Sequence, residues 1–197
     1  MGVSRWPVFA LALALAGLVW TGTRVINGRP FPPDTTPEGA YARIALAIAE
    51  RRPRDAFAYL ETEAQWASYT ILEARKRACK RVRESYPQGE RASTIREWMD
   101  LDAAPEPPDA FAVLALRRGW IARLERDLSG VARVDVQGER ATVVTGRGTR
   151  YPFRRRENGI WGLTIFTAEL QAEAERASND LEVVEHAAAD YDRAKGP

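Results

Sequence analysis

An uncharged hydrophobic run between Trp6 and Trp20 is the first pattern along the chain. Arg5 precedes the run, and leucine alternates with alanine inside it, as in a signal peptide or a short membrane anchor. Continued to Thr23 the run has 18 residues, and as a helix it would span roughly 27 Å, slightly less than a typical hydrocarbon core. Residues 1–23 are therefore predicted to be a signal peptide or membrane anchor, with residues 6–23 in the membrane.

The residues at the end of this run are compatible with a cleaved signal peptide and with an uncleaved anchor. Thr21, Thr23, Ala14 and Ala16 are small enough for a cleavage site, but no A-x-A follows the apolar run, which favours an uncleaved anchor. We expect the domain to lie outside the cytoplasm, at the inner (plasma) membrane or, after cleavage, as a periplasmic or secreted protein. A buried core helix of a cytosolic protein is the remaining alternative.

A proline-rich stretch separates the run from the rest of the chain. Three prolines between Asn27 and Asp34 fix φ and remove backbone donors, so residues 24–36 are predicted to be an extended linker. Residues 37–197 are predicted to form a single α+β domain, because a helical period gives way to a period of two. Its parts are helices in 37–129, a sheet in 131–166 and a terminal helix over 167–194.

Helical spacing begins directly after the linker. Residues 35–38 combine a threonine cap, a proline in the first turn and a carboxylate near the positive end of the helix dipole, which predicts a helix start. Pro53 interrupts this helix, and a second one carries residues 57–60. Thr62 with Glu63 is expected to cap a third helix that runs to about Tyr86. The apolar residues of the third helix include Trp66, Tyr69, Ile71 and Leu72.

Shorter helices are predicted in the remainder of this half. Residues 90–100 form one, and the proline-rich stretch 102–109 ends it. Asp109 is expected to cap a last helical stretch, which Gly119 bends and which Ser129 and Gly130 end.

The period changes to two at Val131. Turns are predicted at residues 137–139, at 146–148 and at Asn158-Gly159, so residues 131–166 should form a four-stranded antiparallel meander. One face of the sheet is expected to be aliphatic and aromatic, and the other basic. Pro152 is awkward in this arrangement, because it lacks a ladder donor and yet falls in an internal strand.

The terminal helix, with Thr167 as its expected cap, carries a narrow apolar seam. The seam residues are Leu170, Ala174, Ala177, Leu181, Val184, Ala188 and Tyr191. Such four-three spacing serves either packing within the same chain or contact with a protein partner or a second copy through helix 167–194. His186 falls off the seam and is expected on the surface.

Composition and the absence of known motifs leave several classes of function without support. The formal net charge is +2, and without residues 1–23 the chain keeps 28 basic and 27 acidic residues, so no nucleic acid partner is expected. Cys79 is the one cysteine, which leaves no intramolecular disulfide and no cysteine cluster for a metal. No phosphate-binding, dinucleotide-binding, zinc-protease or nucleophile-elbow motif is present, and no cofactor, metal or catalytic residue is predicted.

Two groups of basic residues are candidates for contact with an anionic surface. The first lies in the charge run 75–83 of the third helix, opposite an apolar arc that holds Cys79, and consists of Lys76, Lys80, Arg81 and Arg83. The second, on the sheet, consists of Arg150, Arg154 and Arg156. A solvated face is the simpler interpretation of the helical group, and anionic lipid headgroups are the alternative.

Two stretches resemble the NTF2-like superfamily of cone-shaped α+β domains, which includes exported bacterial modules. Residues 40–60, with ARIALAIAE before RPRDAF, look like its opening helix pair, and residues 153–163, FRRRENGIWGL, are similar to its late hairpin. The resemblance implies an isomerase or dehydratase with an acid, histidine or tyrosine in the cone, although no such set of residues carries over. Two features of this chain depart from the family pattern. The other helices all precede the strands, and a long helix follows the last strand. Asp55, Glu61, Asp100 and Asp102 near the helix breaks are interpreted as caps and solvated charges.

The leading hypothesis is a membrane-anchored or exported envelope protein of non-catalytic type that binds a protein partner or a small ligand. One alternative is an NTF2-like enzyme with an acid in an apolar cone. The other is an electrostatic scaffold on anionic lipid.

Overall fold

A computed structural model describes residues 31–195. The chain divides into two compact units, residues 1–32 and residues 33–197, and the helices and strands of the described residues all belong to the second unit. The predicted signal peptide or anchor, 1–23, and most of the predicted linker lie outside the described residues. Within the described part, no helix is both long enough and apolar enough to cross a membrane.

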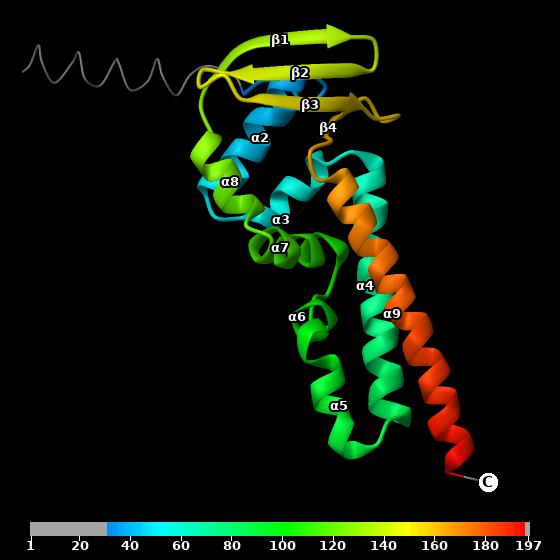
Figure 1. Cartoon of the computed structure of the whole chain (residues 1–197). Coiled ribbons are helices and arrows are strands. Elements are labelled where there is room, and N and C mark those ends of the chain that lie inside the picture. The colour runs from blue at the N-terminus through cyan, green and yellow to red at the C-terminus, as the bar shows by residue number, and fades with distance from the viewer. Residues whose placement is uncertain (1–30, 196–197) are drawn as a thin grey trace, which may run out of the picture. The chain divides into compact units, whose positions relative to one another are not determined.

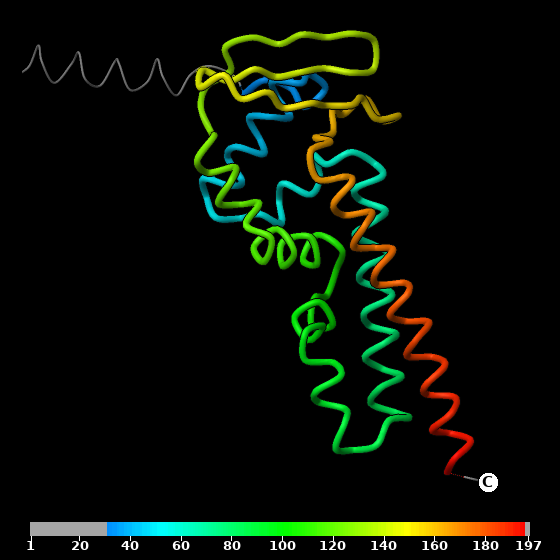
Figure 2. Tube along the Cα trace, viewed as in Figure 1, coloured from blue at the N-terminus to red at the C-terminus, as the bar shows by residue number. Residues whose placement is uncertain are grey.

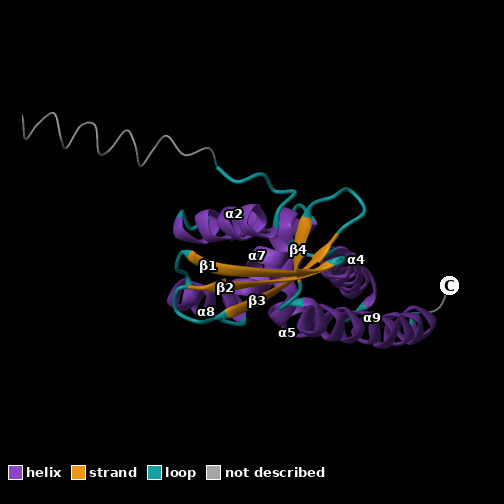
Figure 3. Ribbon diagram, turned by 90° about the horizontal axis from the view of Figure 1, so that it is seen from above, coloured by secondary structure: helices purple, strands orange, loops and turns teal. Residues whose placement is uncertain are grey.

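The fold is α+β, with helices, a four-stranded antiparallel sheet and a long C-terminal helix as predicted (Figure 1). One end of the molecule, which we call the head, packs helices against one face of the sheet (Figure 3). The helices of the head are α2 (Pro37–Ala49), α3 (Pro53–Ala56), the 3₁₀ turn η1 (Phe57–Tyr59), α7 (Pro107–Arg117) and α8 (Trp120–Asp127).

The head is filled by aromatic side chains. Phe111 and Phe166 are fully buried, with ring centroids 6.2 Å apart, and Trp120 stacks on Phe166 at 4.8 Å. Tyr41 from α2 contacts Tyr151 from the sheet at 5.4 Å. Rings of this size supply most of the buried apolar area and tie the helices to the sheet.

The sheet is the predicted meander, in the order β1-β2-β3-β4. Its strands are β1 (Val131–Gln137), β2 (Arg140–Thr145), β3 (Arg150–Arg155) and β4 (Trp161–Leu163). Gly138 and Gly159 have φ of 58° and 82°, which the two hairpin turns require. Pro152 is tolerated in the internal strand β3 because its backbone faces the side of β4, which ends at Leu163. There the Pro152 carbonyl accepts a hydrogen bond from the Thr164 amide at 3.1 Å, and the missing donor lies past the end of the strand.

The other end, which we call the stalk, consists of helices alone (Figure 2). Helices α4 (Thr62–Ser85) and α9 (Thr167–Ala194) start at the sheet and run side by side in the same direction. Their ion pairs Arg77–Glu185 and Arg81–Asp192 advance together along both helices. Helices α5 (Gln88–Ile95), η2 (Arg96–Trp98) and α6 (Met99–Asp102) return towards the head.

A second apolar core holds the stalk together. Ala78, Cys79 and Val82 of α4 are fully buried, and they share this core with Leu181 and Val184 of α9. The predicted seam of the terminal helix therefore packs within the chain, and a partner of this helix would have to use another face. His186 is exposed, as predicted.

The helix starts show which caps were correctly predicted. Thr36 caps α2 as predicted, and its hydroxyl accepts a hydrogen bond from the Gly39 amide at 3.1 Å. Thr62 and Thr167 are the first residues of α4 and α9 and not their caps. Asp109 lies one turn inside α7 and completes a capping box with Glu106, the true cap. In each of these three cases the predicted cap is a polar residue that belongs to the first turn of the helix.

Candidate functional site: a cleft at the start of helix α4

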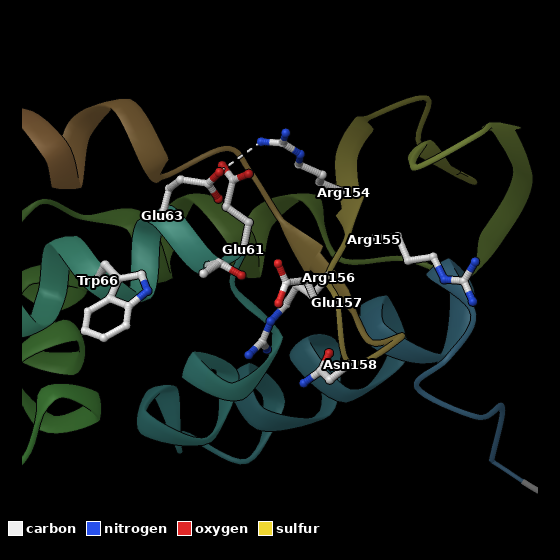
Figure 4. Close-up of a pocket in the computed structure, with 9 residues that line it drawn as sticks. Glu61, Glu63, Trp66, Arg154, Arg155, Arg156, Glu157 and Asn158 are labelled. Carbon is white, nitrogen blue, oxygen red and sulfur yellow. Dashed lines mark hydrogen bonds and ion pairs between the residues drawn. The ribbon is translucent and has the colours of Figure 1, made fainter.

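The cleft lies between the first turns of α4 and the hairpin that joins β3 to β4 (Figure 4). Its volume is about 550 Å³. The residues that line it are Glu61, Thr62, Glu63, Trp66, Arg154, Arg155, Arg156, Glu157 and Asn158. Charges of both signs and one indole ring therefore face the same space.

A close backbone contact joins the start of α4 to strand β4 beside the cleft. The Glu61 amide donates to the Leu163 carbonyl at 3.2 Å, and Leu60 forms a parallel bridge with Leu163. Gly162 makes this approach possible, because a Cβ at that position would stand 2.5 Å from the Glu61 Cα. The start of α4 is thus joined directly to the edge strand β4.

Glu61 connects the starts of the two long helices. The residue is 6% exposed, and its carboxylate accepts a hydrogen bond from the hydroxyl of Thr167, the first residue of α9. A carboxylate in this place also benefits from the positive ends of two helix dipoles. The start of α4, which forms one wall of the cleft, is therefore held to the start of α9.

Arginines of β3 and its hairpin form the opposite wall. Arg154 forms an ion pair with Glu63 at 3.0 Å across the cleft, as Figure 4 shows. Arg156 donates to the Ala58 carbonyl at 2.9 Å and to Gln65 Oε1 at 3.1 Å. Arg155 and Glu157 are exposed, and Arg155 is 3.9 Å from the Glu139 carboxylate. The contacts of Arg154 and Arg156 hold the wall in position, and the exposed residues are accessible to a ligand.

Trp66 forms the apolar side of the cleft. Its side chain is 65% exposed, and the neighbouring Tyr69, at a centroid distance of 5.6 Å, is 47% exposed. Sequence reasoning grouped both with the apolar residues of the helix, but only Ile71 and Leu72 are buried. The signal was present in the spacing, since at about 100° per residue Trp66 lies roughly 140° from Ile71 around the helix.

The predicted basic residues of α4 are spread along the stalk, each with a partner among the described residues. Lys80 is 3.9 Å from Glu84, Arg81 is 3.2 Å from Asp192, and Arg83 pairs with Asp102. Lys76 donates to the Pro105 carbonyl at 3.3 Å. These contacts are largely exposed, so they orient the side chains more than they stabilise the fold.

The predicted basic residues of the sheet divide between two places. Arg154 and Arg156 line the cleft, whereas Arg150 lies on the open face of the sheet. There the alternation of the strands adds Arg140 and Arg133, and sequence reasoning missed Arg140. Arg133 pairs with Asp135 at 3.0 Å, and neither Arg140 nor Arg150 has an ion pair among the described residues.

A buried charge cluster joins α4, α7 and α9 outside the cleft. Arg75, 4% exposed, is 2.6 Å from Asp180 and 3.6 Å from Glu173, and its guanidinium lies over the Trp98 ring. Glu173 also receives hydrogen bonds of 2.6 Å from Arg118 and Arg176.

The surroundings of Glu173 act on its ionisation in opposite directions. Burial alone would raise the pKa of Glu173, but the hydrogen bonds from Arg176 and Arg118 outweigh burial and hold that pKa below its ordinary value. The cluster is therefore a structural ion network, in which an ionised carboxylate is enclosed by guanidinium groups.

The acids near the helix breaks have local partners. Asp55 pairs with Arg52 at 2.9 Å and Asp100 with Arg117 at 2.7 Å. Among the described residues, no group of histidine, cysteine or carboxylate side chains is placed to hold a metal ion.

No family model matches the chain, and the comparisons with curated proteins and with solved structures find no match. The interpretation of the cleft therefore depends on its own geometry.

Proposed function

We propose that the chain is a membrane-anchored or exported envelope protein of non-catalytic type, and that its domain binds a partner in the cleft at the start of α4. The leader pattern of residues 1–23 supports the location. The observation that carries the binding role is the exposed indole of Trp66, 65% in solvent beside a pair of opposite charges. An exposed tryptophan that is surrounded by polar residues is typical of a binding hot spot.

The chemistry of the lining favours a polypeptide segment over a small ion. The cleft combines the flat apolar face of Trp66 on α4 with Arg155 and Glu157 on the side of the β3–β4 hairpin. A segment with one apolar side chain flanked by charged residues could match all three. A ligand of uniform charge would meet repulsion from one of the two signs. A small polar ligand with an apolar face is the second form of the same proposal.

Site-specific photo-crosslinking in growing cells tests the cleft. A photoreactive phenylalanine replaces Thr62, an exposed residue of the cleft lining, in the full-length chain, and a matched variant carries it at Val183, which is 68% exposed on α9 and away from the cleft. We expect a discrete crosslinked product from position 62 that is absent from position 183 and is weakened by Trp66→Ala. The same products from both positions, or none from position 62, would contradict a polypeptide partner.

Anionic lipid is the second candidate function, and one specific observation supports it. Arg140 and Arg150 lie on the open face of the sheet with no ion pair among the described residues. Their guanidinium groups could contact headgroups if the anchor holds the domain at a membrane. The test places a fluorophore at Thr142→Cys in full-length protein in nanodiscs. Quenching by brominated anionic lipid, reversed by high salt and by Arg140→Glu with Arg150→Glu, would favour this function.

The resemblance to the NTF2-like superfamily stays a proposal. It is supported by the packing of the opening helix α2 against the late strand β4. An isomerase or dehydratase would need an acid in an apolar pocket. Glu61 is the acid in the cleft that comes nearest to this description, and its carboxylate already accepts a hydrogen bond from Thr167.

A further inference from the structure

The outer edge of the sheet at β1 is unpaired. β1 is the outermost strand, seven residues long, and no described element lies beyond it in Figure 1. A β-bulge between Val131 and Arg133 ends its regular part, so residues 133–137 form the regular free edge. Such an edge is a template for another strand unless it is blunted.

The direction of the backbone groups along this edge follows from the hydrogen bonds of β2. The Arg155 amide donates to the Glu139 carbonyl at 2.8 Å, which makes Arg140 and Arg154 a non-hydrogen-bonded pair. The amide and carbonyl of Arg140 therefore point towards β1, to Gln137. Alternation along β1 then directs the backbone groups of Val134 and Val136 outwards, away from the sheet.

We propose that this edge pairs with the same edge of a second copy of the chain, antiparallel and centred on Val134. In this register Val134 meets Val134 of the second copy as a hydrogen-bonded pair. The outward amide and carbonyl of each Val134 are paired with those of the other. The two four-stranded sheets become one sheet of eight strands with a twofold axis perpendicular to it.

The charges on β1 select this register. Centring on Val134 places Arg133 opposite Asp135 of the second copy, twice, in the close non-hydrogen-bonded positions. A slip that keeps the hydrogen bonds moves the centre by one residue. It then places Arg133 opposite Arg133 or Asp135 opposite Asp135, which is repulsive. The same sequence therefore favours one pairing and opposes its neighbours.

The apolar residues of β1 support the same pairing. Val136 is 55% exposed although it points to the side of the sheet that the helices cover, because β1 has no neighbour on its outer side. In the paired sheet the two copies of Val134 contact each other across the axis. Val136 lies two residues further along the same edge, beside the β1 strand of the second copy.

Disulfide crosslinking tests the register in the full-length chain. Hydrogen-bonded antiparallel pairs have Cα atoms about 5.5 Å apart, within the range for a disulfide. We expect Val134→Cys to form a covalent dimer with diamide as oxidant, and Val183→Cys to stay monomeric. Arg133→Cys and Asp135→Cys, which face each other as a non-hydrogen-bonded pair in this register, should crosslink when mixed but not separately. Buried Cys79 should not interfere. Equal crosslinking of Val134→Cys and Val183→Cys would overturn the pairing.

Charge reversal supplies a second test that is independent of disulfide geometry. In the Val134→Cys background, Arg133→Asp or Asp135→Arg alone should lower the crosslinking yield about tenfold, because each places like charges opposite each other. The two substitutions together should restore the yield. Circular dichroism confirms that each variant is folded. Unchanged yield in the single variants, or no recovery in the double variant, would overturn the proposal.

Discussion

Gly162 lies directly against the backbone of Glu61, at the start of α4 and next to the cleft. A Cβ on residue 162 would meet backbone atoms of Glu61 and Leu60 at 2.5 to 2.8 Å, and backbone cannot move aside as a flexible side chain can. We therefore expect Gly162→Ala to lower the free energy of unfolding by about 2–3 kcal/mol. Urea denaturation followed by circular dichroism measures the change.

Gly89 is the matched control for this substitution. It lies in α5 with nothing within 4 Å of an added Cβ. Gly89→Ala should leave stability unchanged or raise it by up to about 1 kcal/mol, since alanine favours a helix over glycine. Equal losses at positions 89 and 162 would show that the close contact is not what limits residue 162.

Glu173 is the residue on which the buried ion network depends. Glu173→Gln removes the charge that Arg118 and Arg176 share and leaves Arg75 with Asp180 as its remaining partner. We expect a loss of about 2–3 kcal/mol in the free energy of unfolding, because a charge removed from a buried pair leaves its partners uncompensated. Glu185→Gln, in the exposed pair with Arg77, should cost at most about 1 kcal/mol.

The pH dependence of stability provides a separate check on Glu173. Its pKa is lower in the folded protein than in the unfolded chain, for which the ordinary value is 4.5. The stabilisation is therefore complete above pH 4.5 and is lost as the pH falls through the folded pKa. The stability difference between wild type and Glu173→Gln should shrink in this acidic range. A difference that stayed constant down to pH 3 would contradict the ion network.

Cys79 gives a prediction about reactivity. Burial raises the pKa of the Cys79 thiol to about 11, and the side chain is fully covered in the stalk core. In native protein at pH 8 the thiol should react with an aromatic disulfide reagent at least about 100-fold more slowly than in denaturant, because both access and ionisation are suppressed. Fast reaction in the native state would mean that the stalk opens readily.

The stalk depends on the seam between α4 and α9. Leu181→Ala should lower the free energy of unfolding by about 2–3 kcal/mol, because the residue is buried in the stalk core. Val183→Ala, two residues away on the exposed side of α9, should change it by less than about 0.5 kcal/mol. Thermal or urea unfolding of both variants measures the contrast. Similar losses would place the seam on the wrong face of α9.

Elements with a strong local period were predictable from the sequence. The terminal helix has the predicted bounds, and the meander has its predicted turns, because alternation and turn glycines are local signals. Helix caps were less predictable, since several polar residues of one first turn compete for the role, as at Glu106 and Asp109. The contact of Gly162 with Glu61 had no local signal. It joins segments about 100 residues apart.

The arrangement of the two long helices could be predicted only in part. The seam of α9 was correctly located, but nothing in its spacing specified α4 as the partner or a parallel direction. The spacing places Trp66 away from Ile71 on α4, but only the structure shows that its exposed ring faces the β3–β4 hairpin across the cleft. The burial of Arg75 within a charge run follows from the packing of α4 on α9.

At the scale of the whole molecule, the head and the stalk have separate apolar cores, and α4 and α9 pass through both. The cleft lies where these two helices begin, next to the sheet. The described chain also starts near this place, since the Trp161 indole donates to the Thr35 carbonyl at 3.1 Å.

The location of the domain is the central claim, and fractionation of cells that express the full-length chain tests it most directly. Alkaline carbonate extraction is combined with the intact mass of the product. We predict full mass in the membrane pellet or, if the leader is cleaved, a soluble product outside the cytoplasm that lacks roughly the first 23 residues. A soluble cytoplasmic product of full mass would contradict the account.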